Sequence, residues 1–233
     1  MAQAPSSVAV HRGVLSDGVY EALKAMIMDR DIEPDSKINM DRLATSLEVS
    51  PTPVREALAR LEGDGLVIKR PLVGYTAAPL LDEQGVDELY ELRSLVEPAA
   101  AGWAAGRITK DAVSGLRRQV RDARAASKAV SGGDYESYRQ FAAFDSRLHE
   151  TIAEASGRKL LLQTIQRLHP HAQLYRLYFR PGVDRKTIAE HAAIVRAIDQ
   201  GDPEQAARAM TEHLAHSRDR VRASLTKPRA VRD

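Results

Sequence analysis

The chain has 233 residues, a formal net charge of +2 at pH 7, 43% hydrophobic residues and only 5% aromatic residues. It contains no cysteine, which excludes disulfides and thiolate metal sites, and no apolar run approaches the roughly 18 residues of a membrane span. The opening segment MAQAPSSVAVHRG has no positive region before an apolar core, so we expect no secretory signal, no membrane partner and a cytoplasmic protein.

The small net positive charge is unevenly distributed along the chain. Residues 1–80 hold 9 Lys and Arg against 11 Asp and Glu, whereas residues 81–233 hold 25 against 21. Any affinity of the first part for DNA must therefore come from a few locally placed cations and not from the overall field.

The N-terminal part of the chain predicts three helices. Apolar residues recur at helical spacing over 14–30, over 40–47 and again over 51–64, with short turns between these segments. Pro51 is tolerated in the first turn of the third helix, where backbone amides have no partner within the helix, and Gly65 follows its end as a C-cap.

Two short strands are predicted after these helices. Residues 66–68 and 75–77 are β-forming segments joined through Pro71 and Gly74. A helix, a turn, a second helix and a β-ribbon are typical of a winged helix-turn-helix, in which the second helix of the motif lays its N-terminal residues against base edges.

Six residues of this element are expected to contact double-stranded DNA. They are Ser50, Thr52, Arg55, Lys69, Arg70 and Gly74. Arg55 is the first cation of the third helix and can pair bidentately with guanine, unless it pairs with Glu56 or Glu62 on a solvated face. The hydroxyls suit phosphate or base contacts, the two wing cations suit phosphates, and the glycine allows close approach of the backbone.

The segment SPTPVREALARLEGDGLV, followed by a glycine-containing wing, resembles the N-terminal domain of the GntR superfamily of bacterial transcriptional regulators. The resemblance covers residues 14–78 and places Arg55 at the arginine of the family's recognition helix. The sequence departs from the family at Pro51 and at Asp41, where other members carry arginines, and both changes remove positive charge from the DNA face.

The rest of the chain predicts an all-α antiparallel bundle, so the expected fold is mostly α. Residues 1–13 are expected to be a flexible start, 79–83 a linker, 84–224 an effector-binding and dimerisation domain, and 225–233 a flexible tail. The predicted helices are 83–105, 109–130, 134–156, 158–179, 184–200 and 203–224, separated by glycine and proline. Pro98 is expected to kink or restart the first of them, and Trp103 to pack in the interior or in a dimer contact.

Four polar residues of this bundle suit a divalent metal ion. Asp145 and His149 are four residues apart and share one helix face, while His191 and His213 each lie beside apolar positions. Three imidazoles and a carboxylate are suitable ligands for a first-row ion. The alternative is that the histidines are hydrogen-bonded core residues, and no HExxH motif is present.

The segments ELRSLVEPAAAGWAA, AFDSRLHETIAEASGRKLL and AEHAAIVRAIDQGDPEQAARAMTEHL resemble the FCD effector domain of the FadR subfamily. This resemblance implies that Asp145, His149, His191 and His213 bind a divalent metal ion, with zinc the first choice and nickel or manganese as alternatives. It also places Arg93 near the pocket of a small carboxylate effector. The alternative for Arg93 is an intrahelical pair with Glu97.

These observations predict a homodimeric regulator that binds a palindromic operator and is not an enzyme. A single recognition helix reads only a few base pairs, and a two-fold pair reads a palindrome. Two alternatives are a regulator that senses the metal itself and a metal-dependent hydrolase or lyase. Against the enzyme, no nucleophile elbow, phosphate loop or evident general base accompanies the metal-binding residues.

Overall fold

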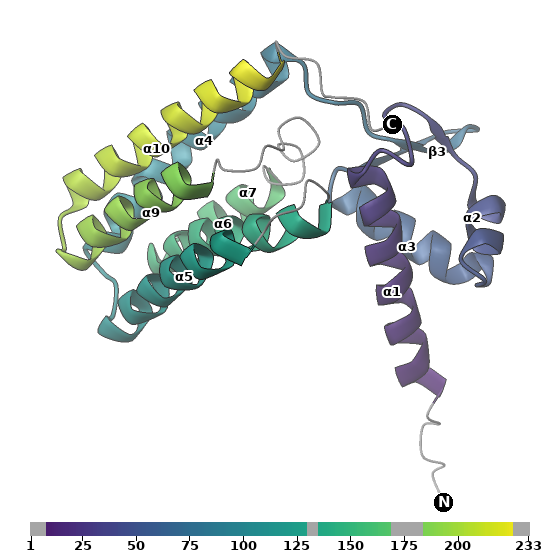
Figure 1. Cartoon of the computed structure of the whole chain (residues 1–233), viewed down its shortest axis with the longest axis horizontal. Coiled ribbons are helices and arrows are strands. Elements are labelled where there is room, and N and C mark those ends of the chain that lie inside the picture. Colours follow the sequence, from purple (N-terminus) through teal and green to yellow (C-terminus); the bar gives the residue numbers. More distant parts are fainter. Residues whose placement is uncertain (1–7, 130–134, 169–183, 226–233) are drawn as a thin grey trace, which may run out of the picture. The chain divides into compact units, whose positions relative to one another are not determined.

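The structure, a computed structural model, describes residues 8–129, 135–168 and 184–225. The chain divides into two compact units, Met1–Leu80 and Leu81–Asp233 (Figure 1). None of the helices in these described ranges is both long and apolar enough to span a membrane.

The N-terminal unit has the predicted winged helix-turn-helix fold. Its elements are α1 (Val8–Met28), β1 (Lys37–Ile38), α2 (Met40–Ser46), α3 (Pro51–Gly63), β2 (Val67–Arg70) and β3 (Gly74–Ala77). The strands form one antiparallel sheet in the order β1-β3-β2. Strand β1 was not predicted, because its two residues lie at the end of a polar turn and are ordered only by pairing with β3.

The apolar spacing of α3 explains how this helix is held. Val54, Leu58 and Leu61 recur at intervals of four and three residues and are fully buried, and α3 packs against α1. The helix ends where Gly65 takes a positive φ of 70° and the Leu66 amide donates to the carbonyl of Leu61 at 2.9 Å. A glycine adopts this left-handed conformation at no steric cost.

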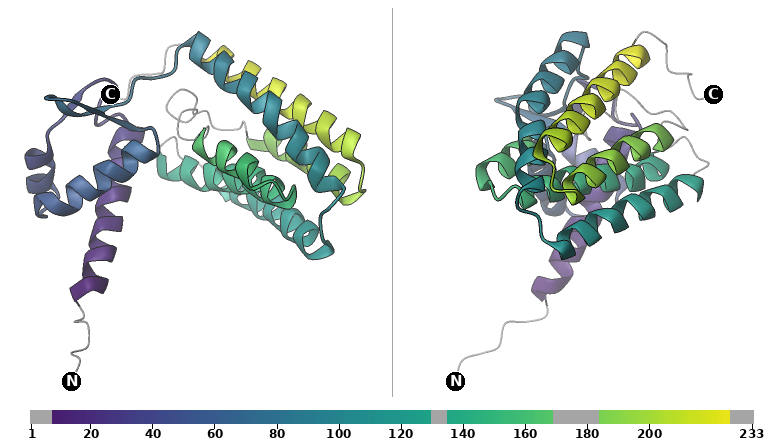
Figure 2. Two further views of the ribbon diagram at one scale, coloured as in Figure 1. Left: turned by 180° about the vertical axis from the view of Figure 1, so that it is seen from behind. Right: turned by 90° about the vertical axis from the view of Figure 1, so that its left-hand side faces the viewer.

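The C-terminal unit is the predicted helical bundle. Its helices are α4 (Glu83–Ala105), α5 (Lys110–Ala129), α6 (Tyr135–Ala155), α7 (Lys159–Arg167), α9 (Asp184–Asp199) and α10 (Pro203–Leu225). Helices α4 and α10 lie side by side and pack most extensively, and α9 packs on α10 and on α5 (Figure 2). The prediction of a helix over 158–179 is met as far as Arg167, and residues 169–179 lie outside the described ranges.

The core of this unit combines small and branched side chains from five helices. Buried members include Val86 on α4, Leu116 on α5, Ile152 on α6, Ile194 on α9 and Met210 on α10. Because each helix contributes one apolar face, their inward polar residues are brought close together in a region with little water.

The structure excludes one of the two alternatives expected for Pro98 and one of the two expected for Trp103, both on α4. The helix does not restart at Pro98 but continues from Glu83 to Ala105, because it is packed along α10 and α6 on its inner side. Trp103 is not an interior residue, since 43% of it is exposed. The alanines at 100, 101 and 104 take the inward positions, so the indole lies on the outer face, where the guanidinium of Arg158 lies 4.7 Å from its ring centre.

Candidate functional site

The N-terminal part of α3 presents its polar residues to solvent. Ser50, Thr52 and Arg55 are all exposed. Ser50 is the N-cap residue, but its side chain makes no capping hydrogen bond. No residue that the structure describes forms an ion pair with Arg55, so neither of the expected acidic partners binds it. The guanidinium is therefore available to an external acceptor.

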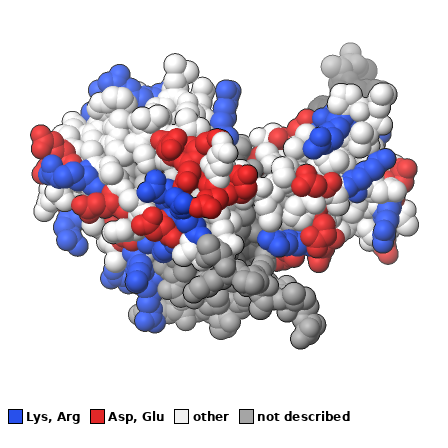
Figure 3. Space-filling model, turned by 90° about the horizontal axis from the view of Figure 1, so that it is seen from above, with Lys and Arg blue, Asp and Glu red and all other residues white. Residues whose placement is uncertain are grey.

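The wing presents the other cations expected to contact DNA. Lys69 and Arg70 lie on β2 and are exposed, and Nε of Arg70 donates to the hydroxyl of Thr76 at 3.3 Å. Gly74 is exposed and has a φ of 95°, a conformation that favours glycine. On the face shown in Figure 3, Lys and Arg side chains are interspersed with Asp and Glu, so the charges form no large field of one sign.

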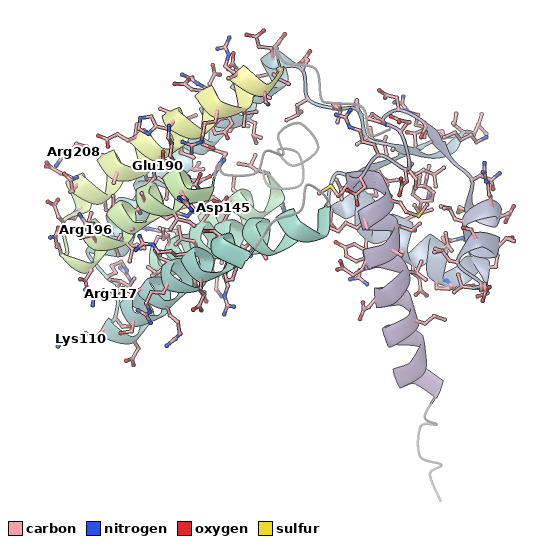
Figure 4. All side chains as sticks on the ribbon, viewed as in Figure 1. Lys110, Arg117, Asp145, Glu190, Arg196 and Arg208 are labelled. Carbon is pink, nitrogen blue, oxygen red and sulfur yellow. The ribbon has the colours of Figure 1, made fainter. Side chains whose placement is uncertain are left out.

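Three helices of the C-terminal unit bring four potential metal ligands together. Asp145 (labelled in Figure 4) and His149 come from α6, His191 from α9 and His213 from α10, and one ligand atom from each lies within 4.8 Å of the others. Opposite ligands of one ion at 2.1 Å are separated by roughly 4.2 Å, so small side-chain movements would suffice to hold an ion. The donor set therefore fits a divalent metal ion.

One buried nitrogen of this cluster is placed as a metal ligand would be. Nε2 of His191 lies 3.2 Å from Oδ1 of Asp145, yet it makes no hydrogen bond to any residue in the described ranges. The nitrogen is buried, and such a group is costly unless something binds it. The imidazole rings of His191 and His213 have centres 4.6 Å apart, so these nitrogen ligands share one small space.

Two buried hydrogen bonds in series, from His149 to Glu97 and from Arg93 to Glu97, fix the orientation of His149. Its Nδ1 donates to Oε2 of Glu97 at 2.5 Å, and the other oxygen of Glu97 accepts from Nε of Arg93 at 2.6 Å. All three side chains are nearly fully buried. A carboxylate on one ring nitrogen selects the tautomer that presents the other nitrogen to a metal.

A second series of the same kind supports His213. Its Nδ1 lies 2.9 Å from Oε2 of Glu190, the residue labelled in Figure 4, and Arg220 binds both oxygens of that carboxylate at 2.8 Å. His216 also lies 3.3 Å from Glu190, but its side chain is 59% exposed. Two of the three clustered imidazoles are thus each backed by a carboxylate and an arginine.

Burial sets the protonation of these groups. It lowers the pKa of His213 to about 3, more than Glu190 raises it, and it lowers the pKa of His149. Burial alone would raise the pKa of Glu190, but His213 and Arg220 lower it to about 2. At neutral pH His149 and His213 are therefore uncharged, which is the form that coordinates a metal.

Arg93 forms the intrahelical pair with Glu97 that the sequence analysis gave as the alternative to an effector contact. Its Nε binds Glu97, whereas the buried Nη2 finds no hydrogen-bond partner among the described residues. The guanidinium carbon lies 5.2 Å from the ring centre of Tyr90, whose hydroxyl is 2.7 Å from Ser217 Oγ. A buried guanidinium with an unused donor suits an anionic ligand.

Sequence reasoning missed the supporting residues Glu190 and Arg220. Their signal was present, because His213 and Arg220 are seven residues apart on α10 and so lie on one helix face, while Glu190 directly precedes His191. Only the packing of α9 on α10 brings these three residues together.

Comparisons with known proteins match both units. Residues 15–76 match the model described as bacterial regulatory proteins, gntR family, and residues 88–216 match the FCD domain. The chain is 30% identical to the putative L-lactate dehydrogenase operon regulatory protein of Escherichia coli over an aligned length of 227. The match covers 86% of this chain and 84% of the relative. It is 34% identical to the probable D-xylose utilization operon transcriptional repressor of Paenarthrobacter nicotinovorans over 175 residues, 74% of each chain.

Solved structures show the same fold. E. coli McbR/YncC is similar with a TM-score of 0.70 and 19% identity, covering 90% of this chain and 97% of that protein. A putative GntR transcriptional regulator from Rhodococcus sp. RHA1 is similar with a TM-score of 0.64 and 18% identity, covering 89% and 97%.

Proposed function

This chain belongs to the GntR family of bacterial transcriptional regulators and carries an FCD effector-binding domain, and on that premise we propose that an organic acid bound beside a metal ion controls its affinity for DNA. The winged helix-turn-helix is the DNA-binding unit. We propose that its contacts are those of Ser50, Thr52 and Arg55 at the base edges and adjacent phosphates, with Lys69, Arg70 and Gly74 on the wing.

The observation that carries the effector part is the buried cluster of Asp145, His149, His191 and His213. These four residues would hold the ion, with zinc the first choice and nickel or manganese as alternatives. When bound, the ion would supply a Lewis acid to which a carboxylate can bind. The support for this assignment is the neutral state of His149 and His213 and the carboxylates of Glu97 and Glu190 behind them.

Arg93 would be the second contact of the acid. Its buried Nη2 is available to an external oxygen, while Glu97 keeps the guanidinium in place through Nε. A planar guanidinium and a carboxylate match in shape and charge, so the effector would be a small organic anion.

We also propose that the regulator is a homodimer that reads a palindromic operator. The surface in support is an apolar strip on the outer face of α4 and the start of α7. Its members are Leu92, Leu95, Trp103 and Leu160, which are 50%, 74%, 43% and 79% exposed. A second copy of the chain would cover this strip and supply the second recognition helix.

The effector would act by differential binding. It can shift the DNA affinity only by as much as it prefers one arrangement of the two DNA-binding units over the other, typically about 1–3 kcal/mol. The acid and the operator would then change each other's affinity by the same factor.

The deciding experiment measures what the purified chain contains and how it responds. Elemental analysis and mass spectrometry of the released small molecule identify the ligands, and operator affinity is then measured for protein stripped with chelator, reloaded with metal, and given the acid. We expect a change in affinity only when both metal and acid are present. A full change with metal alone would make the chain a metal sensor, and turnover of the acid would make it an enzyme. Either result would overturn the proposal.

A further inference from the structure

A groove on the C-terminal unit lies apart from the metal cluster. It runs between α5 and α9 and has a volume of about 300 Å³. Val120 and Val195 contribute apolar surface, and Val195 is almost fully buried. Three arginines line the same groove, Arg117 and Arg121 from α5 and Arg196 from α9. Figure 4 labels Arg117 and Arg196.

The groove carries more positive than negative charge. Asp199 is its one acidic lining residue, and it pairs with Arg117. Arg121 and Arg196 form no ion pair within the ranges that the structure describes. Arg117 and Arg121 are four residues apart on one helix face, an arrangement of like charges that is unfavourable by itself. A bound anion would offset this repulsion, because it attracts both guanidinium groups.

We propose that this groove binds a small organic phosphate. Guanidinium groups from two helices present parallel N–H donors that match the oxygens of a phosphate, and a dianion neutralises the two arginines that lack an acidic partner. The apolar surface between them suits the organic part of a phosphate monoester. The volume is at the lower end of the range for small-molecule sites, roughly 300–1,000 Å³.

The site is separate from the proposed metal and acid site, although one helix carries parts of both. Ala192, Val195 and Arg196 line the groove, whereas His191 belongs to the buried cluster. Val195 lies one helical turn after His191, whereas Ala192 and Arg196 lie on the neighbouring face of α9. A ligand in the groove therefore contacts the helix that supplies one of the four clustered side chains, without needing a metal ion to bind.

The test is titration calorimetry of the full chain with phenyl phosphate at low ionic strength. In Arg121→Gln/Arg196→Gln we expect the dissociation constant to rise about tenfold or more, since two charge-assisted contacts are lost. The matched control is Arg118→Gln/Arg124→Gln, which removes the same charge from exposed positions of α5 outside the groove. We expect this control to bind within about twofold of the parent chain.

The proposal would be overturned by no binding, by unchanged binding in the groove variant, or by an equal loss in the control, which would indicate a general effect of charge. The titration is repeated after the metal is removed with chelator, and binding should persist. Loss of binding after removal of the metal would show that the phosphate binds the metal ion and not the groove. This result would overturn the groove site but would not affect the proposed function. Phenylacetate should bind more weakly than phenyl phosphate, and equal affinity would refute the phosphate class.

Discussion

Glu190 on α9 lies 2.9 Å from Nδ1 of His213 on α10, and this carboxylate directs the opposite ring nitrogen toward the other clustered imidazoles. Arg220 binds both oxygens of the same carboxylate, so the orientation of His213 is set by the protein and not by an ion. The residues that hold His213 are therefore as informative about the site as the proposed ligands themselves.

Glu190→Gln should weaken metal binding by about 10–100-fold, because the amide no longer raises the basicity of His213 or pairs with Arg220. Competition against a chelator of known affinity measures the effect. Glu212→Gln is the matched control, since Glu212 precedes His213 but is exposed. Equal metal affinities for the parent chain and Glu190→Gln would contradict the role given to this carboxylate.

Arg93→Lys should weaken the response to the acid about tenfold and leave DNA affinity without effector unchanged. Lysine keeps the positive charge near Glu97 but lacks the planar pair of donors that a carboxylate needs. Calorimetry with candidate acids and operator binding are the two measurements. Arg147→Lys on the exposed face of α6 should respond like the parent chain. An undiminished response to the acid in Arg93→Lys would show that Arg93 does not contact the effector.

Arg55→Ala should reduce specific operator affinity by about 1–3 kcal/mol, the value of one bidentate base contact. The melting temperature should not change, because Arg55 is exposed and makes no ion pair in the described part of the chain. Binding is measured at fixed salt, with Arg118→Ala as a variant of equal charge. Unchanged operator affinity would refute the assignment of Arg55.

The metal-free protein should lose stability as the pH falls below about 6.5. The folded state lowers the pKa of His213 from 6.5 to about 3, so between these values the unfolded chain binds a proton that the folded chain excludes. Each such histidine can reduce the free energy of unfolding by up to about 1.4 kcal/mol per pH unit in this window and contributes nothing above it.

Chemical denaturation with chelator at pH 7 and pH 5.5 measures this slope. It should be shallower in His213→Gln and unaltered in His216→Gln, since the side chain of His216 is 59% exposed. An identical slope in the parent chain and His213→Gln would show that His213 is not held uncharged by burial. The measured range from pH 7 to pH 5.5 lies above the ordinary range of the carboxylates, so Glu97 and Glu190 contribute little to this slope.

Leu95→Asp should weaken or abolish the homodimer, because a charged side chain would have to be buried in the apolar strip. Leu95 is 74% exposed in the single chain, so the monomer should fold normally. Sedimentation at several concentrations measures the association. Leu72→Asp, at a fully exposed leucine in the wing, should remain dimeric. A parent chain that sediments as a monomer would contradict the proposal directly.

Helix α3 and the wing could be predicted from local sequence because their determinants are local. Buried apolar residues recur at helical spacing in α3, and Gly65 and Gly74 occupy positions with positive φ. Strand β1 could not be predicted, since two residues at the end of a polar turn become a strand only when β3 lies beside them. Pro98 likewise predicts a break that helix packing prevents.

The candidate site likewise contains some residues that could be predicted from the sequence and others that could not. Residue type and spacing indicated Asp145, His149, His191 and His213, which the structure brings together. The partners that orient two of the imidazoles could not be named, because the Glu190 contact crosses from α9 to α10 and the Glu97 contact from α4 to α6. Arg121 and Arg196 share a groove for the same reason, through the packing of α5 on α9.

The unbroken course of α4 has a mechanical consequence. At 1.5 Å per residue, its 23 residues form a rod about 34 Å long, with Arg93 on its buried side and Trp103 on its outer side. Because α4 does not restart at Pro98, a displacement of Arg93 by the proposed acid would be carried along one continuous helix to the indole of Trp103. Under the proposed function, binding of the acid in the interior would thereby alter the outer surface of the bundle through this one helix.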